Sequence, residues 1–173
     1  MQSDKIKRFV LDALLLAVAL IFSYVEAILP LNIFLPLPAF KLGLANVVIM
    51  LAVWAISWVD AVAVSVLRIF IMGLLFGNPV SIWFSLGGGL FSLISLAILK
   101  KWCDGRFSFV GASIISAASH NVGQVIFATV FFGVNIVTSY LPVLLIASVV
   151  FGGLCGALVN FVYPKIQRIK ELK

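Results

Sequence analysis

The chain consists of long uninterrupted stretches of apolar residues that are separated by short breaks. The breaks contain proline, glycine, asparagine or charged residues, and most stretches approach the roughly 20 apolar residues that a helix needs to cross a membrane. Apolar residues make up 64% of the 173-residue chain and charged residues only 10%. A soluble domain is about 45–50% apolar and 25% charged. We therefore expect a single integral-membrane domain over residues 1–173.

Cutting the apolar stretches at the breaks predicts six membrane-spanning helices. Gly77-Asn78-Pro79 indicates a tight turn, and Pro142 is expected where a helix begins. The segment Ser57–Asp60 is so short that the helices on either side must be antiparallel neighbours, and Asp60 can cap the second of them. The predicted fold class is all-α, a polytopic membrane protein with a six-transmembrane-helix bundle. Its helices are expected at about 9–29, 42–58, 60–76, 80–99, 109–133 and 141–163.

Lysine and arginine residues gather at three places along the chain. All except Lys41 and Arg68 lie at residues 5–8, in the break at 100–106 or in the tail from residue 165. Six crossings put all three groups on one side, and clustered basic residues beside spans mark the cytoplasmic side. We therefore predict that both termini are cytoplasmic and that the protein is a multi-pass protein of the inner (cytoplasmic) cell membrane. The net charge of +6 then reflects topology, and we expect no nucleic-acid partner.

The sequence does not favour a metal or nucleotide site. Cys103 and Cys155 are far apart and the chain has a single histidine, so neither a zinc site nor a redox motif is expected. No GxxxxGK[ST] phosphate-binding loop occurs in the chain. We expect no cofactor, and ATP could act only through a partner module.

A few ionisable residues fall inside the predicted spans, where each costs about 2.5–3.5 kcal/mol on insertion scales. Arg68 is the most informative, because its guanidinium stays charged and cannot be left against lipid. One interpretation is an internal ion pair with Glu26. The other is contact with an anionic group of a substrate, and Lys41 is expected nearby. Both interpretations can hold, because Glu26 can pair with Arg68 until substrate arrives. Lys41 could equally be an interfacial anchor.

A polar stripe runs along the predicted helix 109–133, because its polar residues repeat at three- and four-residue intervals. The stripe consists of Ser113, Ser116, His120 and Gln124. A lone His120 would be typical of helix packing, but Asn121 and Gln124 at adjacent depths favour a lining for a polar ligand. Asn46 is a further neutral partner inside the spans. Tyr140 is either an interfacial anchor or a gate at the outer face. The sequence thus predicts a site for a small anionic or zwitterionic solute.

Several of these residues belong to an ordered set of short motifs between Glu26 and Gly156. The motifs are Lys41-Leu42-Gly43-Leu44-Ala45-Asn46, Arg68, Ser85 with Gly87-Gly88-Gly89, Ser119-His120-Asn121 with Gln124, and Tyr140-Leu141-Pro142. This set resembles the bacterial Gx transporter family, also labelled heptaprenyl diphosphate synthase component I. That family is similar to the substrate-binding S components of energy-coupling factor (ECF) transporters. The chain departs from the family at Ala39, where glycine is expected.

The resemblance implies a six-helix bundle like that of ECF S components, with a ligand cavity open to the outer side. It implies a substrate-binding set of Glu26, Lys41, Asn46, Arg68, Ser85, His120, Asn121, Gln124 and Tyr140. It also implies that Ala13 and Ala17, on a small-residue face of the first helix, dock on the transmembrane coupling subunit of an ATP-driven module with its ATPases.

The synthase label supplies a second hypothesis, a membrane subunit or scaffold linked to isoprenoid synthesis. Prenyl chain elongation needs paired acidic clusters that hold magnesium around diphosphate. No two of the six acidic residues lie within three positions of each other. We therefore expect no enzyme and no catalytic residue. A passive channel is disfavoured, because the chain has no repeated polar ring.

Overall fold

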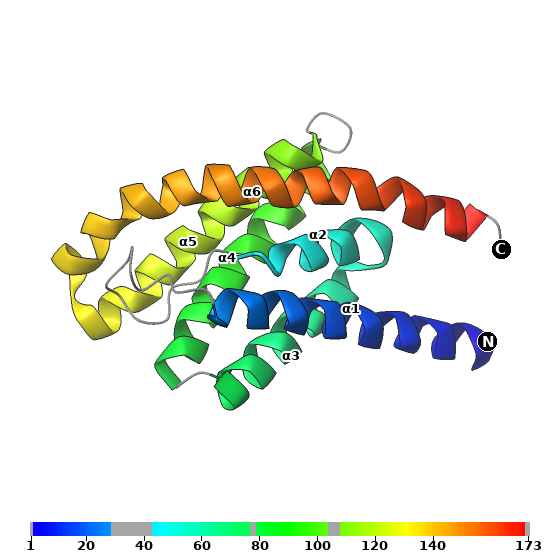
Figure 1. Cartoon of the computed structure of the whole chain (residues 1–173), viewed down its shortest axis with the longest axis horizontal. Coiled ribbons are helices and arrows are strands. Elements are labelled where there is room, and N and C mark those ends of the chain that lie inside the picture. Colours follow the sequence, from blue (N-terminus) through cyan, green and yellow to red (C-terminus); the bar gives the residue numbers. More distant parts are fainter. Residues whose placement is uncertain (1, 29–42, 77–78, 104–107, 172–173) are drawn as a thin grey trace.

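The computed structural model describes residues 2–28, 43–76, 79–103 and 108–171, and this part of the chain is helical apart from short turns. The helices are α1 (Gln2–Ile28), α2 (Asn46–Ala55), α3 (Trp58–Phe76), α4 (Pro79–Cys103), α5 (Phe109–Phe132) and α6 (Val134–Glu171) (Figure 1). Within the described ranges, five of them, all except α2, are long and apolar enough to cross a membrane. The predicted class, an all-α polytopic membrane protein, is confirmed.

Helix α2 is shorter than the predicted span 42–58. It has ten residues, which is about 15 Å and so half of the roughly 30 Å of bilayer hydrocarbon. The chain turns at Gly43, whose φ of +83° suits a residue without a side chain. All residues of α2 except Trp54 are buried, and α2 contacts each of the other five helices. An apolar helix of this kind is a core helix rather than a lipid-facing one.

Helix α6 begins earlier than predicted and does not start at Pro142. It starts at Val134, continues through Pro142 and Pro164 and ends at Glu171. Gly133, with a φ of +80°, is the one residue between α5 and α6. The chain therefore reverses direction directly after α5, and both prolines lie within α6.

The bundle is centred on α2, with α5 packed between α4 and α6 and with α3 between α1 and α4 (Figure 1). Two glycines of α6 allow its close approach to α5. A Cβ atom at Gly156 would lie 2.4 Å from the Cα of Val110, and one at Gly152 would lie 2.9 Å from the Cα of Ile114. Small residues at this spacing let helix backbones pack tightly.

The start of α1 and the end of α6 lie at the same end of the molecule (Figure 1). Arg8 of α1 joins α3 there, because its Nη2 lies 2.7 Å from Oδ1 of Asp60. Asp60 does not cap α3 as predicted, because the helix begins two residues earlier. The cap is Ser57, whose Oγ accepts a hydrogen bond from the backbone N–H of Val59 at 3.1 Å.

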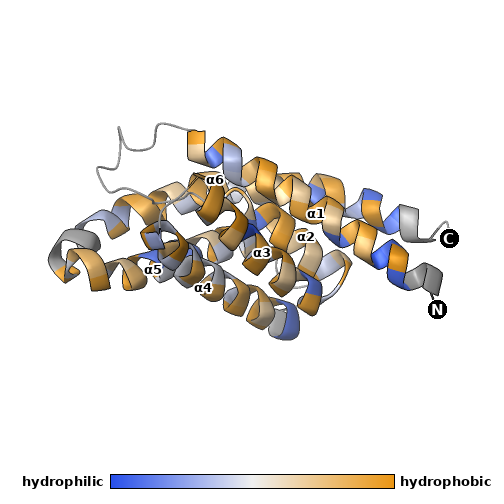
Figure 2. Cartoon of the chain, turned by 90° about the horizontal axis from the view of Figure 1, so that it is seen from below, coloured by the Kyte–Doolittle hydropathy of each residue, from blue (hydrophilic) through white to orange (hydrophobic). Residues whose placement is uncertain are grey.

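Most residues of the long helices are apolar, and the hydrophilic residues of α1 and α6 are concentrated toward the chain ends (Figure 2). Large apolar side chains are exposed on the long helices, including Phe9, Leu74 and Ile146. A soluble monomer rarely exposes so large an apolar surface. This surface fits a lipid environment.

Candidate functional site

A group of polar side chains is buried around the start of α2. Glu26, near the end of α1, is buried, and its Oε1 accepts a hydrogen bond from the backbone N–H of Gly43 at 2.5 Å. The N-terminus of a helix carries about half a positive charge. The Glu26 carboxylate therefore lies where the α2 dipole stabilises an anion.

Arg68 lies near the middle of α3 and is only 4% exposed. Its Nη1 donates a hydrogen bond to Oγ of Ser23 on α1 at 3.1 Å, and the Glu26 carboxylate attracts the guanidinium electrostatically. Within the described part of the chain, Arg68 Nε has no hydrogen-bond partner. Arg68 and Glu26 thus interact electrostatically, and the choice between an internal pair and contact of Arg68 with a substrate stays a prediction. Sequence reasoning missed Ser23, although it precedes Glu26 by three residues and so shares its helix face.

The imidazole ring of His120 lies between two glycines, Gly88 and Gly43. A Cβ atom at Gly88 of α4 would lie 2.6 Å from its Cε1, and one at Gly43 would lie 3.6 Å from its Cδ2. His120 is 2% exposed. Asn46, the first residue of α2, is also buried, and its Nδ2 lies 2.9 Å from where a Gly43 Cβ would be. We call Glu26, Asn46, Arg68 and His120, with the Gly43 backbone, the polar cluster.

The polar stripe of α5 is buried along its length, as its spacing predicted. Its members are all buried, namely Ser113, Ser116, His120 and Gln124. Oγ of Ser116 lies 2.8 Å from Oγ of Ser92 on α4. The stripe therefore faces protein rather than lipid.

Three other residues of the predicted set make contacts elsewhere. Asn121 faces α6, where its Nδ2 donates to the carbonyl of Leu144 at 3.0 Å and to Oγ of Ser148 at 2.8 Å. Ser85 donates to the carbonyl of Ser81 at 2.7 Å within α4. Tyr140 packs on a small apolar group formed by Phe84, Val125, Ala128 and Leu144. Lys41 lies outside the described residues.

Both ends of α2 meet a side chain of complementary charge. Glu26 accepts from Gly43 just before the helix begins, and Nζ of Lys100 on α4 donates to the carbonyl of Val53 near its end. A carboxylate at the N-terminus and an ammonium at the C-terminus both stabilise the helix dipole. Lys100, predicted as a topological charge, therefore also anchors α2.

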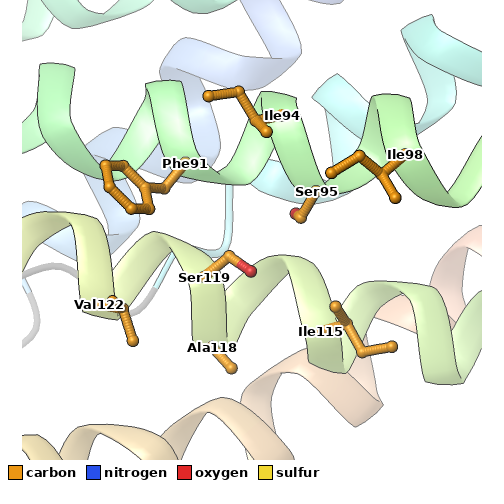
Figure 3. A pocket seen from close by; sticks show the side chains of 8 residues that line it. All are labelled: Phe91, Ile94, Ser95, Ile98, Ile115, Ala118, Ser119 and Val122. Carbon is orange, nitrogen blue, oxygen red and sulfur yellow. The ribbon is translucent and has the colours of Figure 1, made fainter.

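A separate groove of about 400 Å³ lies between α4 and α5 (Figure 3). It is lined by Phe91, Ile94, Ser95, Ile98, Ile115, Ala118, Ser119 and Val122. Apart from two serine hydroxyls, these side chains are apolar. None of the residues of the polar cluster lines the groove, so the groove and the cluster are distinct features. Across the described ranges, no three His, Cys, Asp or Glu residues are grouped to hold a metal ion.

The fold and the cluster define a class, a multi-pass α-helical membrane protein with charged residues buried among its helices. The heptaprenyl diphosphate synthase component I family matches residues 15–162, and the chain belongs to this family. The family named from the sequence motifs is therefore confirmed. No curated protein and no solved structure matches the chain.

Proposed function

We propose that this protein is the substrate-binding, S-component-like subunit of a membrane transporter and captures a small anionic or zwitterionic solute for uptake. The observation that carries the proposal is the polar cluster, to which α1, α2, α3 and α5 each contribute a side chain. Ionisable groups inside a membrane domain are costly and mark substrate pathways by default. Half-length helices whose N-termini point at a buried site are typical of transporters, and α2 is a ten-residue helix whose start meets the polar cluster.

The cluster can recognise both signs of charge. Arg68 supplies a guanidinium, Glu26 a carboxylate, and Asn46 a neutral amide. Such groups match the carboxylate, amino and hydroxyl groups of a small polar solute, whereas an apolar compound would leave them unpaired at a cost. This arrangement is the basis for an anionic or zwitterionic substrate.

Helix α1 supports a partner role. Ala13 and Ala17 are exposed, and among the described helices α1 contacts only α2 and α3. The small residues Gly152 and Gly156 of α6, by contrast, pack inside the protein. Small residues favour close helix packing in lipid. We propose that this face of α1 docks on a transmembrane coupling subunit whose ATPases supply the energy, in the bacterial inner membrane with both termini cytoplasmic.

The binding site is tested by native mass spectrometry of protein released from detergent. The wild type is expected to retain a small polar molecule, which Arg68→Ala and His120→Ala each lose while both variants still fold. Ser119→Ala is the matched control, because Ser119 neighbours His120 but lines the groove. Equal retention by the wild type and both cluster variants would refute the site.

A second candidate is a membrane subunit or scaffold for heptaprenyl diphosphate synthesis, without catalysis of its own. The groove between α4 and α5 favours it, because an apolar groove of about 400 Å³ on the membrane-facing side can hold part of a hydrocarbon chain. A retained polyprenyl lipid that is lost in Ala118→Trp but kept in Arg68→Ala would select this candidate. The missing acidic pairs argue against an enzyme in either case.

A further inference from the structure

The start of α2 differs from the other helix starts for which a cap is described. Ser57 caps α3 and Ser108 caps α5 through their hydroxyl groups. The N-cap residue of α2 is Ala45, and it makes no side-chain hydrogen bond to the helix. The anion at this helix start comes instead from a distant part of the chain, since Glu26 is 17 residues from Gly43.

Among the described residues, two buried donors near this carboxylate have no acceptor. Within the described part of the chain, neither Nδ2 of Asn46 nor Nε of Arg68 has a hydrogen-bond partner, and both residues are more than nine-tenths buried. Asn46 Nδ2 lies beside Gly43, and Arg68 is attracted by Glu26. A buried donor without an acceptor costs about as much as a lost hydrogen bond. Both donors would be satisfied by an anionic group with more than one oxygen.

We propose that the start of α2 is a carboxylate-binding site, which Glu26 occupies in this structure and for which the carboxylate of the solute competes. The solute carboxylate would accept hydrogen bonds from the Gly43 N–H, Asn46 Nδ2 and Arg68. This inference rests on the proposed function and narrows the solute to a carboxylate-bearing compound.

Competition rather than joint binding follows from charge. Two carboxylates beside one guanidinium repel each other strongly where water is excluded. Exchanging one carboxylate for another keeps the net charge of the polar cluster constant. A carboxylate is also the group that this helix start already accommodates, which favours it over the larger and more highly charged phosphate.

The experiment removes the internal carboxylate and supplies one from solution. Glu26→Ala protein in detergent is unfolded thermally, with tryptophan fluorescence as the readout, in increasing acetate. Sodium chloride at equal ionic strength controls for salt, acetamide for shape without charge, and phosphate for a different anion. Asp12→Ala is the matched variant, because Asp12 is the other acidic residue of α1 within its predicted membrane span.

Acetate should stabilise Glu26→Ala saturably, by about 3–6 °C in Tm at about ten times its dissociation constant. The wild type and Asp12→Ala should respond no more to acetate than to chloride, and Arg68→Gln added to Glu26→Ala should abolish the response. Glu26→Gln serves if Glu26→Ala does not fold, because glutamine keeps an acceptor for Gly43 but lacks the charge. Acetate should raise the Tm of Glu26→Gln more than it raises the Tm of the wild type.

The carboxylate site is overturned if neither Glu26 variant shows an acetate effect beyond those of chloride and acetamide, or if phosphate stabilises them more than acetate. An equal acetate response in the wild type or in Asp12→Ala also overturns it. The outcome is separable from that of the transport proposal. A retained solute without a carboxylate would refute this inference and leave the transporter. Acetate rescue without any retained solute would support the carboxylate site at the start of α2 but count against a transported solute.

Discussion

A methyl group added at Gly88 would enter the space that the His120 ring fills. The Cβ of Gly88→Ala would lie 2.6 Å from Cε1 and 2.8 Å from both ring nitrogens. The ring is 2% exposed and lies between α4 and the start of α2, so displacing it forces its buried surroundings to shift. Overpacking of this kind costs about 1–3 kcal/mol.

The expected result is a Tm lower by about 2–12 °C, since 1 kcal/mol corresponds to about 2–4 °C for a chain of 150–250 residues. Solute retention should fall with it, because the imidazole is displaced from the polar cluster. Gly153→Ala is the matched control, since a Cβ there meets no atom within 4 Å. That variant should be neutral or slightly stabilising, because alanine favours a helix more than glycine does.

A double-mutant cycle isolates the contact. In a His120→Ala background the ring is gone, so Gly88→Ala should lose most of its cost, with a coupling energy of about 1 kcal/mol or more. Thermal unfolding of the four proteins measures this coupling. Full additivity, or a Gly88→Ala variant as stable as Gly153→Ala, would refute the placement of His120 against Gly88.

Three further predictions test other parts of the structure. Lys100→Met should lower stability by about 0.5–2 kcal/mol because α2 loses the cation at its C-terminal end, whereas Lys101→Met should change it little; equal effects in thermal unfolding would argue against the anchor. Gly156→Val should impair folding, because its Cβ would lie 2.4 Å from backbone of α5, and normal yield and a normal Tm would contradict that packing. Ala13→Trp and Ala17→Trp should block co-purification with an ECF coupling subunit but leave solute retention intact, and unchanged co-purification would count against the docking face.

The apolar runs predicted the five long helices because a stretch of about 20 apolar residues has few alternatives to a membrane span. They did not predict the length of α2. Its apolar sequence extends on both sides of Asn46–Ala55, so composition does not distinguish a short buried helix from a full span. The positive φ of Gly43 begins the turn before α2, and the sequence shows only that glycine permits it.

The candidate site was partly predictable from helical spacing. The three- and four-residue repeat placed His120 and Gln124 on one buried face of α5. Asn121 was harder, because it also lies three residues from Gln124, and only the neighbouring helix decides which way it faces. Its bonds to Leu144 and Ser148 of α6 depend on the packing of α5 on α6. The bond between Glu26 and Gly43 likewise depends on where α2 begins.

An experimental structure of the protein purified under mild conditions, at a resolution that shows side chains, tests the central claim most directly. The account predicts a bound polar solute at the start of α2, in contact with Arg68 and His120. The account would be contradicted if the polar cluster contained no solute and its side chains contacted only one another, although native mass spectrometry showed that the same preparation retains a molecule. Density for that molecule in the groove between α4 and α5 would contradict it equally.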